Sequence, residues 1–182
     1  MPFKTVTPSV QSLNLGICNC FLLRGTSGYA LIDTGLEKHG NTILKALKEG
    51  GVALSEVKYI LLTHAHSDHA GSAAQLKKTT GATLVAHALD AQIGQIAFFW
   101  PKEGGVLFAG DAAANTLGLR LSISYEDLQL GKLTLAKLAT LPFTIACFGH
   151  GKTLFEGAAS KFAQLGQAGP IGKKTTVSAM SS

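Results

Sequence analysis

Six consecutive residues, HAHSDH at positions 64–69, hold three histidines and an aspartate. Imidazole nitrogens and carboxylate oxygens are ligands that zinc accepts in proteins. The hexad follows the apolar stretch VKYILLT and precedes AGSAAQLKK, so it falls between a predicted buried strand and a predicted helix. Buried without partners, these polar side chains would each cost ~1–3 kcal/mol. We therefore predict a metal site here, in preference to a set of core histidines.

The spacing within the hexad separates two ways of using it. On a helix, His64 and His66 would point to different sides, because residues two apart do not face each other. At the end of a strand they would share a face, because side chains there repeat every two residues. We expect this second arrangement, with Asp68 and His69 turned the other way, so that the hexad serves two adjacent sites.

Two more polar residues follow apolar stretches further along the chain. Asp111 comes after LFAG, and His150 lies between Gly149 and Gly151. Taken alone, Asp111 fits a capped turn equally well, and His150 is typical of a loop residue. Together with the hexad, however, each follows a predicted strand at its carboxyl end, and such ends can converge on one rim of a sheet. The two glycines would let the backbone approach an ion closely.

Strands and helices alternate in the elements that would carry these residues. Strand-like segments are predicted at 17–23, 29–32, 57–62, 82–87, 96–100, 106–109 and 143–148, and helical spacing at 37–48, 70–78, 125–139 and 156–166. Segments 17–23 and 29–32 form a predicted hairpin, and Gly50, Gly51 and Gly81 are predicted to end helices. This alternation favours an α/β fold built in layers.

Composition restricts the class of protein. The 182 residues suit one domain, and 46% hydrophobic with 15% charged residues is typical of a globular core. No apolar run approaches the ~18 residues of a membrane span. The amino end lacks a signal-peptide core, so we expect a cytoplasmic location. The net charge of +5 is scattered over lysines, with only Arg24 and Arg120 as arginines, which argues against nucleic acid as a partner.

The three cysteines lie in apolar contexts. Cys18, Cys20 and Cys147 are predicted to be free, buried thiols of a reducing compartment. A metal site at Cys18 and Cys20 is the alternative, but it lacks a second cysteine pair.

His39, at the start of a predicted helix, is expected at the surface.

HAHSDH matches the H-x-H-x-D-H signature, and the chain thereby resembles the metallo-β-lactamase superfamily. LIDTG at 31–35, LFAGD at 107–111 and FGHG at 148–151 follow in the order typical of that family. The resemblance covers nearly the whole chain and implies an αββα sandwich. The similarity is strongest to its general hydrolases, the relatives of hydroxyacylglutathione hydrolases and lactonases.

The resemblance also implies roles for the residues. His64 and His66 would bind one metal, and Asp68, His69 and His150 a second, with Asp111 bridging the two. Asp33 would orient a ligand from behind, and we count Asp68 and Asp33 as the catalytic carboxylates. The expected cofactor is zinc, as one or two ions, with iron or manganese as alternatives. The metals would acidify a water molecule that attacks a carbonyl.

The chain departs from the family between HALDA at 87–91 and GQIAFF. The family has a G-H-T-P-G-H-like loop there, which supplies a third histidine to the first metal, whereas alignment puts Ala91 at that position. Three explanations remain open: the protein works with fewer ligands, it is a deletion form, or the sequence omits a segment. His87 is the only other histidine nearby that could replace the missing ligand. We expect the second metal site to be stronger than the first, and the sandwich to lack a strand pair. Residues 1–168 would form the domain and 169–182 a flexible tail.

These observations lead to competing functions. The first is a metal-dependent hydrolase of a small ester, thioester or lactone, with a β-lactam as a further substrate. The second is a catalytically impaired metal-binding protein, favoured by the absent loop. An iron-binding redox relative would need a carboxylate beside His66 and a flavin domain, and Ser67 stands there instead. The expected partners are a small-molecule substrate and, through exposed sheet edges, a second copy in a homodimer. Neither nucleic acid nor a membrane is expected.

Overall fold

The computed structural model describes residues 2–87, 95–122 and 127–167. The first sheet has six strands adjacent in chain order: β1 (Lys4–Thr5), β2 (Val10–Asn14), β3 (Asn19–Arg24), β4 (Tyr29–Ile32), β5 (Val57–Leu61) and β6 (Thr83–Val85). Strands β1 to β4 pair antiparallel, and β4, β5 and β6 pair parallel. The predicted hairpin is confirmed as the antiparallel pair of β3 and β4.

The second sheet has the order β11–β8–β7. Its strands are β7 (Phe98–Trp100), β8 (Val106–Phe108) and β11 (Ile145–Cys147). Strand β7 runs antiparallel to β8, and β11 runs parallel to it, so β8 and β11 end at the same edge. A separate antiparallel pair is formed by β9 (Ala113–Asn115) and β10 (Leu119–Leu121).

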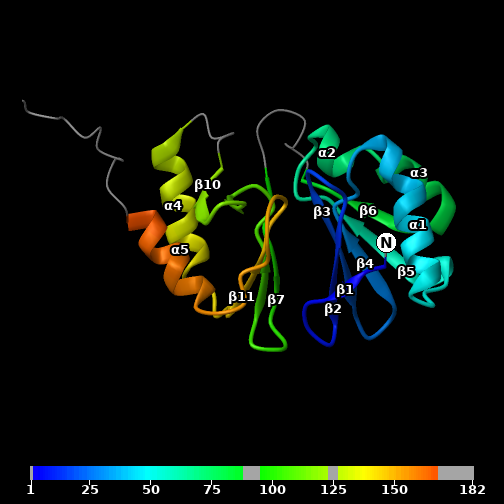
Figure 1. Cartoon of the computed structure of the whole chain (residues 1–182), viewed down its shortest axis with the longest axis horizontal. Coiled ribbons are helices and arrows are strands. Elements are labelled where there is room, and N and C mark those ends of the chain that lie inside the picture. The colour runs from blue at the N-terminus through cyan, green and yellow to red at the C-terminus, as the bar shows by residue number, and fades with distance from the viewer. Residues whose placement is uncertain (1, 88–94, 123–126, 168–182) are drawn as a thin grey trace, which may run out of the picture.

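Helices cover the outer faces of the two sheets. The helices on these faces are α1 (Gly40–Glu49), α3 (Ala73–Thr80), α4 (Leu128–Leu138) and α5 (Ala158–Gln167). Three shorter helical elements, η1 (Glu37–His39), η2 (Leu54–Glu56) and α2 (Ser67–Ala70), lie in the connections. Figure 1 shows the sheets between two helical layers, with α1 and α3 beside the first sheet and α4 and α5 beside the second. The predicted αββα sandwich is therefore the observed architecture.

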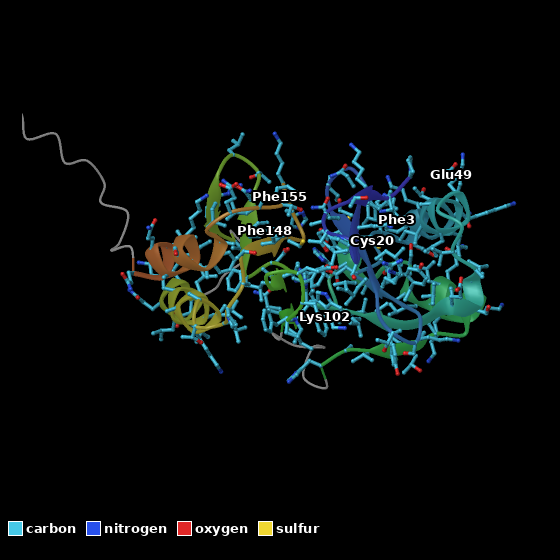
Figure 2. The ribbon with its side chains drawn as sticks, turned by 90° about the horizontal axis from the view of Figure 1, so that it is seen from below. Phe3, Cys20, Glu49, Lys102, Phe148 and Phe155 are labelled. Atoms are coloured by element: carbon cyan, nitrogen blue, oxygen red, sulfur yellow. The ribbon has the colours of Figure 1, made fainter. Side chains whose placement is uncertain are left out.

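Three apolar clusters hold these layers together. Leu31 and Ile60 pack with Ile43 of α1 and Leu76 of α3 in the first cluster. The second cluster, between the second sheet and α4 and α5, includes Leu107, Leu135, Phe148 and Phe162. Figure 2 shows Cys20 of the first cluster and Phe148 of the second in different halves of the molecule, one on each side of its middle. Between the sheets, the Phe21 and Phe108 rings meet edge to face, with centroids 5.5 Å apart.

The sequence predicts no strands at the positions of β1, β2, β9 and β10, and two further details differ from the predictions. Strand β5 ends at Leu61, so His64 and His66 lie in a loop and not on the strand itself. The prediction that His39 is a surface residue is wrong: it is 8% exposed. Its Nδ1 accepts a hydrogen bond from the Leu36 backbone N–H at 3.0 Å, which closes the turn before α1. A sequence pattern does not register this local bond.

Other predictions fall outside the described residues. These are the position of Ala91, the start of the predicted helix at 125, and the tail at 169–182. Helix α4 is described from Leu128, where the Asp127 side chain accepts hydrogen bonds from two backbone N–H groups and begins the helix. Across the three described ranges, no helix has the length and apolar character needed to cross a membrane.

Candidate metal centre

Three segments far apart in the sequence bring polar side chains to one rim of the sandwich. The loop after β5 carries His64 and His66, and the first turn of α2 carries Asp68 and His69. Asp111 follows β8, and His150 follows β11. Because β8 and β11 are parallel neighbours, their carboxyl ends deliver Asp111 and His150 to the same edge.

Backbone hydrogen bonds fix these loops to one another. The Ile96 N–H donates to the Thr63 carbonyl at 2.7 Å, which ties the loop before the hexad to the segment leading into β7. The Gly149 N–H donates to the Gly110 carbonyl at 2.9 Å, and the Asn19 N–H donates to the Gly149 carbonyl at 2.9 Å. The loops are thus held in place by the backbone before any side-chain contact is considered.

The side chains form two adjacent groups, which we call the first and second half-sites. The first comprises His64, His66 and Asp111, and the second comprises Asp68, His69 and His150. Within each half-site the potential ligand atoms all lie within 4.8 Å of one another. His64 Nε2 is 3.0 Å from His66 Nδ1, and His69 Nε2 is 3.3 Å from His150 Nε2. Such spacings suit one cation in each half-site.

Asp111 connects the half-sites. Its Oδ2 lies 3.9 Å from His64 Nε2 and 3.3 Å from His150 Nε2, while its Oδ1 lies 3.5 Å from His69 Nε2. Asp68 Oδ2 completes the second half-site at 3.4 Å from His150 Nε2. Asp111 therefore lies between the histidines of both half-sites.

One atom of Asp111 indicates what is needed at the centre. Within the described chain, Asp111 Oδ1 is buried and has no hydrogen-bond partner. Leaving a charged buried acceptor unpaired costs more than the ~1–3 kcal/mol of a neutral group. A divalent cation between the half-sites would satisfy this oxygen, so the donor set fits a metal of the zinc type.

Groups behind the histidines select which nitrogen faces the centre. His69 Nδ1 lies 2.9 Å from Asp33 Oδ2, and His150 Nδ1 donates to the Ile17 carbonyl at 2.5 Å. Each contact places the N–H on Nδ1 and turns Nε2 towards the centre. Asp33 is thus a positioning residue that touches a candidate ligand from behind and does not face the centre.

Burial and the neighbouring charges shift the pKa values of three histidines at the centre. Burial, followed by the charge of His69, lowers the pKa of His64 to about 4, which keeps this imidazole neutral and able to bind a cation. The hydrogen bond to Asp111 outweighs burial and raises the pKa of His150 to about 9. Burial also opposes the charge on His69, but its hydrogen bond to Asp33 and the charges of the nearby carboxylates together outweigh burial and raise the pKa of His69.

The carboxylate between the half-sites responds to the same charges. Burial disfavours the ionised form of Asp111, but its hydrogen bond with His150 and the neighbouring imidazoles outweigh this and lower its pKa. At neutral pH the metal-free centre therefore holds a negative Asp111 against a protonated His150. A cation that binds there must displace the proton of His150.

Glycine leaves the room that the centre occupies. A Cβ on Gly149 would stand 2.4 Å from His69 Cε1 and 2.5 Å from Asp111 Oδ1. Side chains beyond hydrogen are therefore excluded at this position. The glycine before His150 thus allows the backbone to approach the ligand side chains, as its place in the sequence indicated.

All six predicted ligand residues come together, whereas other candidates do not. His87 and the pair Cys18 and Cys20 belong to neither half-site among the described residues. All three cysteines are free and buried, as predicted. Sequence reasoning did not identify the Ile17 carbonyl or Gln95, whose Oε1 accepts from the Asp111 N–H at 3.1 Å. The Ile17 carbonyl has no recognisable signal in the sequence, because a backbone carbonyl is present at every residue. Gln95 belongs to no ligand motif recognised in the sequence.

The fold and this cluster define the class of protein, and comparisons identify the family. Residues 13–95 match the model of the metallo-beta-lactamase superfamily. A hydroxyacylglutathione hydrolase of Cereibacter sphaeroides is 30% identical over 185 residues, covering 82% of this chain and 67% of the relative. The chain belongs to the metallo-β-lactamase superfamily.

Further comparisons agree on the family and on the fold. A UPF0173 metal-dependent hydrolase of Anaeromyxobacter dehalogenans is 37% identical over 91 residues, covering 43% of this chain. The chain spans 33% of the length of that relative. Among solved structures, the MIM-2 metallo-beta-lactamase superposes with a TM-score of 0.73 at 18% identity, covering 90% of this chain and 86% of that one.

Proposed function

We propose that this chain is a metal-dependent hydrolase that cleaves a small ester, thioester or lactone, with zinc as its cofactor. The observation that carries the proposal is the convergence of two half-sites on Asp111, whose buried Oδ1 lacks a hydrogen-bond partner among the described residues. Zinc bound there would supply Lewis acidity and activate water for attack on a carbonyl. The similarity to a protein named hydroxyacylglutathione hydrolase supports this substrate class.

The protein's own groups divide the work of such a site. Neutral His64 offers a lone pair, and Asp33 and the Ile17 carbonyl hold His69 and His150 with Nε2 towards the centre. Asp68 is 23% exposed at the rim of the second half-site. This exposure supports the proposal that Asp68 accepts a proton from water or passes one to the leaving group.

We also propose that the two half-sites bind metal unequally. The second half-site has two imidazoles and Asp68, with Asp111 in addition, whereas the first has two imidazoles and the shared Asp111. The alignment with hydroxyacylglutathione hydrolase runs over 185 positions yet uses 82% of the 182 residues. Some positions of the relative therefore have no counterpart here, which supports the proposed loss of a segment.

One observation favours the alternative of a catalytically impaired metal-binding protein. Among the described residues, no third histidine reaches the first half-site. Thioester, lactone and β-lactam hydrolysis by the zinc-loaded protein, with and without a chelator, separates the two functions. The hydrolase proposal requires chelator-sensitive turnover of at least one class, lost in His69→Ala. Tight zinc binding without turnover of any class would establish the alternative.

A second copy of the chain is the proposed macromolecular partner. Strand β6 lies at the edge of the six-stranded sheet, and its three residues are exposed, including Leu84 and Val85. An apolar edge strand of this kind can pair with another chain. Sedimentation equilibrium should detect a homodimer that Leu84→Lys weakens, and a monomer at all concentrations would refute the proposed dimer.

The free, buried cysteines support a reducing, cytoplasmic location.

A further inference from the structure

Thr63, the residue before the hexad, lies between Asp33 and His64 and is almost completely buried. Its Oγ1 is 2.8 Å from Asp33 Oδ2 and 3.0 Å from His64 Nδ1, while its backbone N–H donates to Asp33 Oδ1 at 2.8 Å. The same carboxylate contacts His69 Nδ1 at 2.9 Å. Thr63 therefore connects the first half-site to the carboxylate that supports the second.

Counting hydrogens decides the direction of each bond. A carboxylate only accepts, and a threonine hydroxyl has one hydrogen to donate. If Thr63 donated that hydrogen to His64, its own oxygen would face the Asp33 oxygen at 2.8 Å without a hydrogen between them. The hydroxyl must therefore donate to Asp33, and Oγ1 must accept from His64. This requires the hydrogen of His64 to sit on Nδ1, which leaves Nε2 free to bind a cation.

The position of Thr63 is restricted from the opposite side as well. Gly110 has a φ of +52°, and a Cβ built there would lie 2.8 Å from Thr63 Cβ and 3.0 Å from Oγ1. The Thr63 carbonyl also accepts the Ile96 N–H at 2.7 Å. Backbone and side chain are thus both held, so the hydroxyl has little freedom to turn away from Asp33 and His64.

We infer that Thr63 is a positioning residue that fixes the Nδ1–H tautomer of His64 and thereby selectively supports metal binding at the first half-site. Asp33 then orients both half-sites at once, directly through His69 and indirectly through the Thr63 hydroxyl. The inference deepens the proposed function, because its consequence for metal binding rests on the proposed centre. The tautomer itself is a property of the metal-free protein and can be measured without metal.

Thr63→Val removes the hydroxyl and keeps the shape, whereas Thr63→Ser keeps the hydroxyl. Thr80→Val is the matched control, because Thr80 Oγ1 donates to the Leu76 carbonyl in α3, away from the centre. Long-range ¹H–¹⁵N correlation spectra of the metal-free protein report the tautomer of His64. Competitive zinc titration reports the affinity of each half-site. Urea unfolding identifies variants that fail to fold.

We expect the Nδ1–H tautomer in wild type, Thr63→Ser and Thr80→Val, and a mixture of tautomers in Thr63→Val. Zinc affinity at the first half-site should fall about 10–100-fold in Thr63→Val. The second half-site should stay within about twofold. An Nε2–H tautomer in wild type, or an unchanged first half-site in Thr63→Val, would overturn the inference. Absence of zinc binding in wild type would instead refute the proposed function and leave the tautomer test standing.

Discussion

Asp33→Asn is the substitution that most directly tests the organisation of the centre. Asp33 is 2% exposed, and its two oxygens accept from different groups: Oδ1 from the Thr63 N–H and Oδ2 from His69 Nδ1. An asparagine has only one oxygen, so either orientation of its amide sets an N–H against another N–H. The backbone tolerates the change, because asparagine readily adopts the positive φ of 58° found at this residue.

The magnitude follows from the hydrogen bond that is lost. A buried hydrogen bond to a charged group contributes about 1.5–3 kcal/mol, and His69 is fully buried, so solvent does not reduce this value. We expect Asp33→Asn to lower the free energy of unfolding by about 2–3 kcal/mol, or the Tm by about 4–12 °C. If His69 relieves the clash by moving its hydrogen to Nε2, zinc affinity at the second half-site falls about 10–100-fold.

Urea unfolding of the metal-free protein and competitive zinc titration measure these two effects. Asp127→Asn is the matched control: it removes the same charge at the exposed start of α4, where asparagine caps a helix equally well. The control should leave both measurements unchanged. If Asp33→Asn retained wild-type stability and wild-type zinc affinity, Asp33 would not orient His69, and the assignment of tautomers would be incorrect.

Three further predictions concern the rim, the join between the sheets and the core. Gly149→Ala should weaken zinc binding at least tenfold in a competitive titration, because the alanine Cβ would lie 2.4 Å from His69 Cε1 and displace this ligand. Unchanged affinity would show that the loop can move without disturbing the ligands, and would contradict the prediction. Burial opposes ionisation of Glu103, but hydrogen bonds led by that from Thr7 outweigh it and lower its pKa. The ionised Glu103 should therefore stabilise the fold fully above about pH 4.3, and this stabilisation should disappear as the pH falls through the lowered pKa of Glu103. The urea midpoints of wild type and Glu103→Gln should converge in acid, and a difference that stays constant with pH would contradict this prediction. Burial raises the pKa of Cys147 to about 12, so a thiol reagent at pH 8 should label Cys147 only after unfolding. Mass spectrometry measures the labelling, and rapid labelling of the native protein would refute the burial of Cys147.

The sequence by itself determined the candidate ligands and most of the elements, although the strands β1, β2, β9 and β10 were not predicted. Apolar segments followed at once by His64, Asp111 and His150 predicted both the strands and the side of the sheet on which polar groups gather. This was possible because strand and helix periods, glycine stops and a compact ligand motif are local properties. The resemblance to one family then ordered the residues into two metal sites.

Only the tertiary structure decided how these residues are supported. The acceptance of the His150 N–H by the Ile17 carbonyl and the contact of the Thr63 hydroxyl with Asp33 both depend on groups that lie far apart in the chain and are brought together by folding. A hydrogen bond needs its two atoms within about 3 Å, and the sequence does not encode that distance for residues far apart in the chain. The chemical identity of the ligands is therefore local information, whereas their tautomers and charges are set by the packed sandwich.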